Sequence, residues 1–363
     1  MPSKTLIVCP HMHLPGGIAG YYQSLQGYLK NSFEFFHVGA RETGETTYRK
    51  PLNLIRDLFS LNVTLKRTRN EIGTVMFNPS LIPFCVVREG LLLCVAKAHG
   101  CKCIVFFRGW DNHFADVLER YFFKLFMMVF NQADAFIVLS KEFETRIRGW
   151  GFKQPVHIET TTVDDRMLNG FSMQIHRHRN NVSQRNVKLL FLSRVEREKG
   201  IFEAIDAISL LKERHPGIIL HVAGVGACLE AAKMHAEAAG ISNSVHFLGW
   251  VSGQAKADLL SESDLLLLPS SREGMPNCVL EAMAFGLPVL TTPIGGINDF
   301  FENGRFGFLI DDKCPARIAE LVETIISDDK LYHTLSHEAF AYAHDRFLAS
   351  KVAERIIRLC SAA

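Results

Sequence analysis

Two successive series of short apolar runs, separated by longer stretches with helical periodicity, constrain the fold of this chain most. The first series comprises residues 5–9, 33–36, 74–77, 102–107 and 135–139. The second series comprises residues 187–192, 218–223, 245–248, 264–268 and 288–291. Short apolar runs that alternate with helix-like segments predict parallel strands joined by helices. The sequence therefore predicts an α/β protein with two separate doubly wound units.

A polar stretch between the two series, residues 167–186, is rich in Asn, His and Arg and has little apolar periodicity. Such a segment is typical of a linker or an exposed crossing loop. The length of 363 residues also fits two domains. We therefore expect a first domain over 1–166, a linker over 167–186, a second domain over 187–330 and helices over 331–363. These last helices either cap the second domain or cross back to the first.

The charge of the chain is distributed unevenly, although the formal net charge is only +2. Basic residues outnumber acidic ones up to residue 185, and acidic residues outnumber basic ones after it. A basic first half fits an anionic substrate or surface. The excess is too small for a nucleic-acid-binding protein, so we expect no nucleic acid among the partners.

The N-terminus and the cysteines bear on location. The first residues lead directly into a strand, without the apolar core of a signal peptide. The nine cysteines are odd in number and contain no C-x-x-C pair, which favours reduced thiols over disulfides or zinc. We therefore expect a cytoplasmic protein, either free or at the inner face of the cell membrane.

Three apolar segments bear on membrane contact. Residues 81–98 are interrupted by Arg88 and Glu89, and residues 121–130 are too short to span a bilayer. Residues 54–69 mix Leu, Ile and Phe with four basic residues. Such a segment is either a basic amphipathic surface for anionic lipid or an ordinary surface helix.

A glycine-rich loop, Gly16-Gly17-Ile18-Ala19-Gly20, follows the first predicted strand. Glycines at a strand-to-helix turn let backbone N–H groups approach an anion, but such turns are also common for steric reasons. The spacing does not match G-x-G-x-x-G, and the chain has neither a Walker A loop nor H-E-x-x-H. Nearby His11 and His13 have no third ligand partner, so we expect no metal site there.

The most specific pattern follows the strand predicted at 264–268. Glu273 and Glu281 are eight residues apart, and between them lie a loop and the first turn of a predicted helix. Both carboxylates can therefore face one ligand bound at the start of that helix. Backbone groups there are expected to hold phosphate or sugar oxygens, and the residues concerned are Met275, Pro276, Asn277 and Cys278.

Together with its neighbours, this pattern resembles the retaining GT-B glycosyltransferases, family 4 in particular. The resemblance covers residues 193–311 well. It rests on Ser193-Arg194 with Glu198-Lys199-Gly200, Gly224-Val-Gly226, Gly249-Trp250-Val251, the Glu273/Glu281 pair, Gly295-Gly296 and Gly304-x-x-Gly307. The first half matches more loosely, through the Gly16-Gly17 loop and residues 107–111. The resemblance implies two Rossmann-like domains that face each other across a cleft, with the acceptor bound by the first and the nucleotide sugar by the second.

The resemblance also implies roles for charged residues of the second domain. Arg194 and Lys199 would neutralise the donor diphosphate as its bond to the sugar breaks. Glu281 would accept hydrogen bonds from the ribose hydroxyls, and Glu273 would contact the transferred sugar. The other interpretation of residues 194–199 is a solvated charge cluster. An acid near a helix start, such as Glu281, is also an ordinary position.

The remaining roles concern loops. Gly17 would let the first loop close on the phosphates, while Gly249 and Val251 would receive the base through backbone groups, which leaves UDP and GDP both open. Asp111, or else His113, would contact the donor sugar from the first domain. The alternative for Asp111 is a helix N-cap.

Together with the basic first half, this resemblance implies a hexosyltransferase that moves a sugar from UDP or GDP to an oligosaccharide or lipid-linked acceptor, in polysaccharide or glycolipid biosynthesis. The resemblance also implies reaction on one face of the sugar, which would retain its configuration, with Arg and Lys in place of a metal, so no cofactor is expected. Two other functions remain open: a sugar-nucleotide epimerase of similar fold and a non-catalytic sugar-nucleotide-binding subunit.

Overall fold

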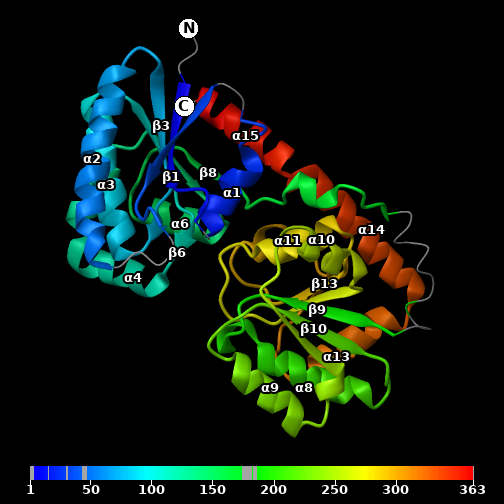
Figure 1. The fold of residues 1–363 in the computed structure, drawn as a ribbon. Helices are drawn as coiled ribbons and strands as arrows, with labels where there is room; N and C mark the ends of the chain where they lie inside the picture. The colour runs from blue at the N-terminus through cyan, green and yellow to red at the C-terminus, as the bar shows by residue number, and fades with distance from the viewer. Residues whose placement is uncertain are drawn as a thin grey trace. The chain divides into compact units, whose positions relative to one another are not determined.

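The computed structural model describes residues 4–14, 16–29, 32–42, 47–173, 182 and 186–362. The chain divides into two compact units, one built from residues up to Thr160 together with those from Ala349 onward, the other from Thr161–Leu348. Each unit contains its own six-stranded parallel sheet (Figure 1). The expected α/β class with two Rossmann-like sheets is therefore confirmed.

In the first unit the strand order is β2-β1-β3-β5-β7-β8, and all neighbouring strands are parallel. The bounds are β1 (Lys4–Pro10), β2 (Phe33–Val38), β3 (Ile72–Phe77), β5 (Lys102–Phe106), β7 (Ala135–Val138) and β8 (Val156–Ile158). A small parallel pair, β4 (Ser80–Leu81) with β6 (Gly109–Trp110), lies apart from this sheet. The strands β4, β6 and β8 are too short to show in the apolar pattern, which is why the sequence does not reveal them.

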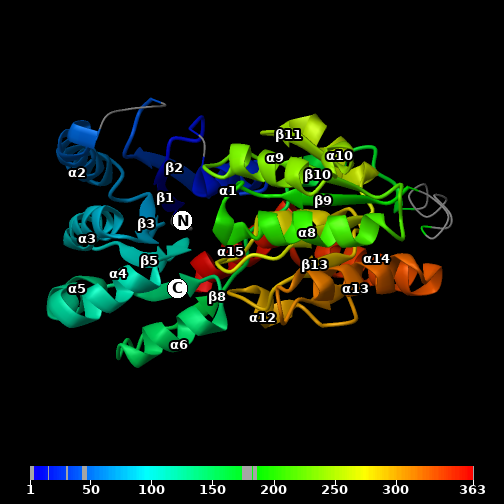
Figure 2. The ribbon, with the colours of Figure 1, turned by 90° about the horizontal axis from the view of Figure 1, so that it is seen from below.

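Helices cover both faces of the first sheet. Figure 2 shows α2, α3 and α5 in a row along one side, and α1 packs against α15. The helix bounds are α1 (Gly17–Leu25), α2 (Lys50–Arg67), α3 (Pro83–Ala98), α4 (Asn112–Val117), α5 (Phe123–Phe130), α6 (Lys141–Gly149) and α15 (Ala349–Ala362). A short 3-10 turn, η1 (Thr47–Arg49), precedes α2, and a π-helical turn, η2 (Leu118–Phe122), precedes α5.

In the second unit the order is β11-β10-β9-β12-β13-β14, again with parallel neighbours. The bounds are β9 (Lys188–Leu192), β10 (Ile219–Ala223), β11 (Val245–Gly249), β12 (Leu265–Leu268), β13 (Val289–Thr291) and β14 (Gly307–Leu309). Strand β12 consists of four leucines, all buried, as expected for a central strand covered on both faces. The sequence pattern did not reveal β14.

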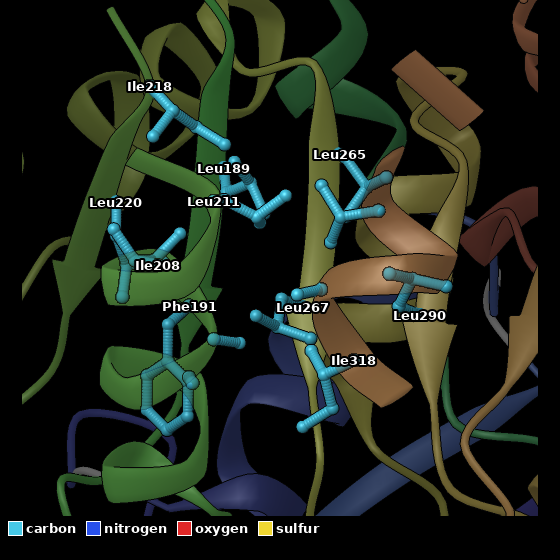
Figure 3. Close-up of a cluster of buried hydrophobic side chains, with 14 of the residues drawn as sticks. Leu189, Phe191, Ile208, Leu211, Ile218, Leu220, Leu265, Leu267, Leu290 and Ile318 are labelled. Atoms are coloured by element: carbon cyan, nitrogen blue, oxygen red, sulfur yellow. The ribbon is translucent and has the colours of Figure 1, made fainter. Parts of the chain in front are cut away.

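The helices of this unit enclose its core. Their bounds are α8 (Ile201–Lys212), α9 (Leu229–Ala238), α10 (Gly253–Glu262), α11 (Asn277–Ala284), α12 (Ile297–Phe300), α13 (Pro315–Ile326) and α14 (Asp329–Arg346). Figure 3 shows part of the core, in which Leu189 and Leu267 of the sheet lie among residues of α8 and α13 such as Ile208 and Ile318. This core fixes the central strands, and therefore the loops that follow them.

The unit boundaries differ from those drawn from the sequence. The division falls after Thr160 rather than after residue 166, and the C-terminal helices, expected as one segment over 331–363, separate at Leu348. Helix α14 stays with the second unit, where Ser336 Oγ donates to the Gly286 carbonyl at 2.6 Å. Helix α15 belongs to the first unit, where Arg355 forms an ion pair with the buried Glu159 at 2.6 Å. Residues 174–181 and 183–185 of the expected linker lie outside the described residues.

Candidate functional site

Lys199 is the buried cation of the second unit. It ends a 3-10 turn (Arg197–Lys199) after β9, and only 7% of the residue is exposed. Its Nζ donates to Glu273 Oε1 at 2.8 Å and to the Arg272 carbonyl oxygen at 3.0 Å. An ammonium group has three N–H donors, and the third has no partner among the described residues. Lys199 therefore joins the loop after β9 to the loop after β12 and keeps one donor for a further acceptor.

The same two loops are fastened at neighbouring points. Ser271 N donates to the Glu198 carbonyl at 2.7 Å, and Ser270 Oγ reaches the same oxygen at 3.2 Å. Gly200 follows with φ +78°, and a Cβ there would lie 2.2 Å from the Pro269 carbonyl oxygen. Glycine is thus required where the backbone passes this close. These hydrogen bonds and this close backbone approach fix the position of Lys199 relative to Glu273.

A third loop supports Glu273 from the other side. Gly295 has φ +53°, and a Cβ there would lie 2.3 Å from the Glu273 carbonyl oxygen. Gly296 N donates to the Gly274 carbonyl at 2.6 Å, and Thr292 Oγ bonds the Ser270 carbonyl. The loop that carries Glu273 is therefore held between the loops that follow β9 and β13.

Glu281 lies on α11 and is buried, with 7% of the residue exposed. Its Oε1 pairs with Lys256 Nζ of α10 at 2.6 Å. Lys256 is a partner that the sequence analysis missed, because nothing in the sequence links α10 to α11. Helix α11 begins at Asn277, so a loop and the first helical turn lie between Glu273 and Glu281, as the sequence predicts.

The Cys278 thiol, near the start of α11, lies close enough to Glu273 and Glu281 to be influenced by their charges. Burial raises the pKa of this thiol well above its usual range, and the negative charges of Glu273 and Glu281 raise it further. No side chain caps α11, so the first N–H groups of the helix are not satisfied by a cap. Around this end, Met275 and Pro276 are buried and Asn277 is exposed.

Arg194 differs from Lys199. Its side chain is 60% exposed, and it pairs with Glu196 at 2.7 Å and with Glu198 at 3.5 Å. For the whole segment 194–199 the sequence left two interpretations open, a binding site or a solvated charge cluster. The structure separates the two cations: Arg194 lies in a solvated charge cluster, whereas Lys199 is buried beside Glu273.

The loop expected to receive a base follows β11. Gly249 ends this strand with φ +70°, and Val251 is half-buried. Trp250 between them is 72% exposed. No role for this indole was predicted, although the sequence shows a tryptophan within the loop expected to receive the base.

Gly17 lies in the first unit, at the first position of α1. A Cβ built on Gly17 would meet nothing within 4 Å. Gly17 is therefore not required by packing among the described residues of its own unit.

Asp111 caps helix α4. Its Oδ1 accepts from Phe114 N at 2.8 Å, and its neighbour His113 is exposed. The N-cap interpretation of Asp111 is thus present in the structure. Arg108, three residues earlier, stacks on the Tyr21 ring at 3.7 Å, and its buried Nη1 has no hydrogen-bond partner among the described residues. Arg108 is a polar candidate that the sequence analysis did not single out.

His11 belongs to a polar cluster at the end of β1. Arg41 Nη1 donates to His11 Nε2 at 2.6 Å, and Arg41 also pairs with the fully buried Asp57. Burial, followed by the positive charge of Arg41, lowers the pKa of His11 to about 4. His11 is therefore neutral at pH 7 and accepts from Arg41. Asp57 also accepts from Gly39 N at 2.8 Å.

Part of the chain is similar to a known protein family. Residues 172–341 match the family described as Glycosyl transferases group 1. Glycogen synthase of Mycobacterium tuberculosis is 32% identical over 145 residues, and D-inositol 3-phosphate glycosyltransferase of an Arthrobacter species is 33% identical over 144 residues. In both cases the match covers 39% of this chain and 34% of the relative, so the chain spans about a third of these relatives.

Solved structures match over nearly the whole chain. Anabaena HepE in complex with UDP has a TM-score of 0.75 at 17% identity, with 99% of this chain and 100% of that chain covered. A glycosyltransferase from Rickettsia africae also has a TM-score of 0.75, at 15% identity and with 99% and 98% covered. At these identities the likeness concerns the fold, and the expected GT-B fold is confirmed.

Within the part of the chain that the structure describes, no helix is both long and apolar enough to cross a membrane. Among the same residues, no group of three or more His, Cys, Asp and Glu side chains could hold a metal ion.

Proposed function

We propose that this protein is a retaining glycosyltransferase of family 4, acting on the cytoplasmic side. It would transfer a sugar from a UDP- or GDP-linked donor to an oligosaccharide or lipid-linked acceptor, in polysaccharide or glycolipid biosynthesis. The observation that carries the proposal is the Lys199–Glu273 pair, with a third Lys199 donor left over, within the segment that matches the group 1 family.

In this reaction the bond between the sugar C1 and the phosphate oxygen breaks, and its electron pair goes to the phosphate. The remaining N–H of Lys199 donates to that oxygen as negative charge grows on it, and Arg194 turns from its surface acids to the diphosphate. The acceptor hydroxyl oxygen bonds C1 on the face that the phosphate leaves, and its proton goes to the departing phosphate. The configuration at C1 is therefore retained, and the charge is neutralised without a metal.

Glu273 orients the donor sugar by accepting hydrogen bonds from its hydroxyls. Its paired Oε1 is fixed by Lys199, and its other oxygen is the one to face the sugar. A single carboxylate fixed by a lysine is suited to orientation, whereas a retaining hydrolase needs a second carboxylate on the opposite side of the sugar.

The nucleotide is bound beside this pair. Glu281, paired with Lys256, accepts from the ribose hydroxyls, and backbone groups of residues 275–278 hold phosphate or sugar oxygens. Gly249 and Val251 receive the base, and the exposed Trp250 is available to stack on it. UDP-glucose is the first donor to test, because HepE has been solved with UDP-glucose.

The first unit contributes Gly17, Asp111 or His113, and the acceptor site. Gly17 lets its loop approach the phosphates without a side chain in the way. Asp111, which caps α4, contacts the donor sugar through its carboxylate.

The test is release of UDP or GDP from UDP-glucose and GDP-mannose, with and without oligosaccharide acceptors. We expect turnover with one donor, and a loss of at least about 100-fold in Lys199→Ala and Glu273→Gln. Arg194→Ala should lower the rate without affecting the fold, since this side chain is exposed. Lys233→Ala, which removes an exposed lysine of α9, is the matched control. Proton NMR of the glycoside formed on the acceptor should show the donor's anomeric configuration.

Three results would overturn the proposal. The first is full activity in both Lys199→Ala and Glu273→Gln. The second is conversion of the donor into its epimer without an acceptor. The third is nucleotide binding without turnover of any donor, together with stable association with another protein.

A further inference from the structure

Helix α2 carries an apolar stripe that faces away from the protein. Leu52, Ile55 and Phe59 are 66%, 66% and 70% exposed, and their spacing of three and four residues places them on one side of the helix. Tyr48, in the turn that precedes α2, extends the stripe. The opposite side of α2 is buried and includes Leu61 and Leu65. A surface helix ordinarily turns its apolar side to the core, so this second stripe calls for another explanation.

The stripe continues over two neighbouring helices. Helix α2 packs against α3, and α3 packs against α5, so the three lie in one layer (Figure 2). On α3, Val87 and Leu91 are exposed, and on η2 and α5 the exposed apolar side chains are Tyr121, Phe122, Leu125 and Met128. Scattered exposed apolar residues are normal, but a contiguous set marks an interaction surface. We call these outward sides the α2–α3–α5 face.

The charge on this face has one sign. Exposed basic residues directly before, on and after α2 are Arg49, Lys50, Arg56, Lys66, Arg67 and Arg69. The acids of these helices are engaged elsewhere: Asp57 is buried with Arg41, Glu89 is buried with Arg88, and Glu119 pairs with Arg146. An apolar stripe with basic neighbours and no outward acid on α2 or α3 is complementary to an anionic apolar boundary.

We propose that the α2–α3–α5 face docks on an anionic lipid bilayer. The apolar side chains enter the boundary between headgroups and acyl chains, and the lysines and arginines pair with lipid phosphates. A second copy of the chain is a poorer occupant, because a two-fold interface would bring the basic residues of one copy against those of the other. The sequence alone pointed only to residues 54–69. The structure instead assigns the surface to three helices.

The test is co-sedimentation of the full chain with vesicles of phosphatidylcholine mixed with phosphatidylglycerol, and with vesicles of phosphatidylcholine alone. We expect binding to the mixed vesicles, little binding to phosphatidylcholine alone, and release at high salt. The variant L52S/I55S/F59S should bind at least about tenfold more weakly. In K66Q/R67Q/R69Q, each charge removed should lower binding by about fivefold. The control L210S/M234S removes exposed apolar residues from the second unit and should bind like the original chain.

Binding is measured without sugar nucleotide, so its outcome is independent of the proposed transfer reaction. Circular dichroism and thermal unfolding of each variant establish that it is folded. The proposal is overturned if the original chain does not bind mixed vesicles, if folded L52S/I55S/F59S binds as tightly as the original, or if both kinds of vesicle bind equally. It is also overturned if the chain is a dimer that L52S/I55S/F59S converts to a monomer.

Discussion

The glycines around Lys199 and Glu273 differ from Gly17 in what the packing of their own unit requires. In the second unit, glycines such as Gly200 and Gly295 lie where any side chain would collide with backbone carbonyl oxygens of the same unit. In the first unit, Gly17 begins α1 with open space around its Cβ position. Contacts within the second unit therefore require the glycines around Lys199 and Glu273, whereas contacts within the first unit do not require Gly17. The loops around Lys199 and Glu273 are preorganised by these contacts.

The largest stability effect is expected for Gly295→Ala. A methyl group at φ +53° would lie 2.3 Å and 2.4 Å from the carbonyl oxygens of Glu273 and Gly274. Strain and collision together should destabilise the second unit by about 2–5 kcal/mol. Urea denaturation followed by hydrogen exchange of residues 265–310 measures this. An unchanged exchange rate there would contradict the preorganised-loop description.

Lys199→Met should cost about 3 kcal/mol of unfolding free energy, because the nearly buried Glu273 loses its ion partner. Restoring neutrality with Glu273→Gln in the same chain should recover part of this loss. A double-mutant cycle by urea denaturation gives the coupling. Purely additive effects of the two substitutions would show that the pair is not coupled and would remove the basis for a fixed Lys199.

Part of this arrangement can be predicted from the sequence, and part of it depends on tertiary contacts. The order of apolar runs predicts both sheets, and the Glu273/Glu281 spacing marks the loop and helix that the structure brings beside Lys199. The pairing of Lys256 with Glu281 depends on how α10 packs beside α11, which no local pattern encodes. The burial of Lys199 beside an exposed Arg194 likewise depends on the loop after β12. Strand β14 depends on its pairing with β13, and the return of α15 to the first unit depends on tertiary contacts such as Arg355–Glu159.

The first unit should show a smaller, pH-dependent effect. His11 has a pKa of about 4 in the fold, below the ordinary 6.5, because of its burial and of the charges of Arg41, His37, His13 and Arg56. The unfolded chain therefore binds the proton first, and stability falls as the pH drops from about 6.5 to about 4. Because His11 is partly exposed, we expect a loss of only about 1 kcal/mol.

Urea denaturation of the original chain and of His11→Asn at pH 7 and pH 5 measures this effect. The variant should lose less stability between the two values. An equal loss in both proteins would show that Arg41 does not hold His11 neutral.

Of these substitutions, Gly17→Ala should have the smallest effect on stability. Open space around the Cβ and a helical position predict a change within about 1 kcal/mol, in the stabilising direction. Donor turnover should nevertheless fall by at least about tenfold if the phosphates approach this loop. A variant with unchanged turnover would leave Gly17 without a role in binding.

We propose that the second unit binds a nucleoside diphosphate beside Glu281. Isothermal titration calorimetry of the full chain with UDP and with GDP tests it most directly, alongside Glu281→Ala and the control Glu237→Ala on the surface of α9. We expect selective binding of one nucleotide. Glu281→Ala should weaken the affinity at least about tenfold, and Glu237→Ala should leave it unchanged. Absence of binding by both nucleotides, or equal affinity in Glu281→Ala, would contradict it.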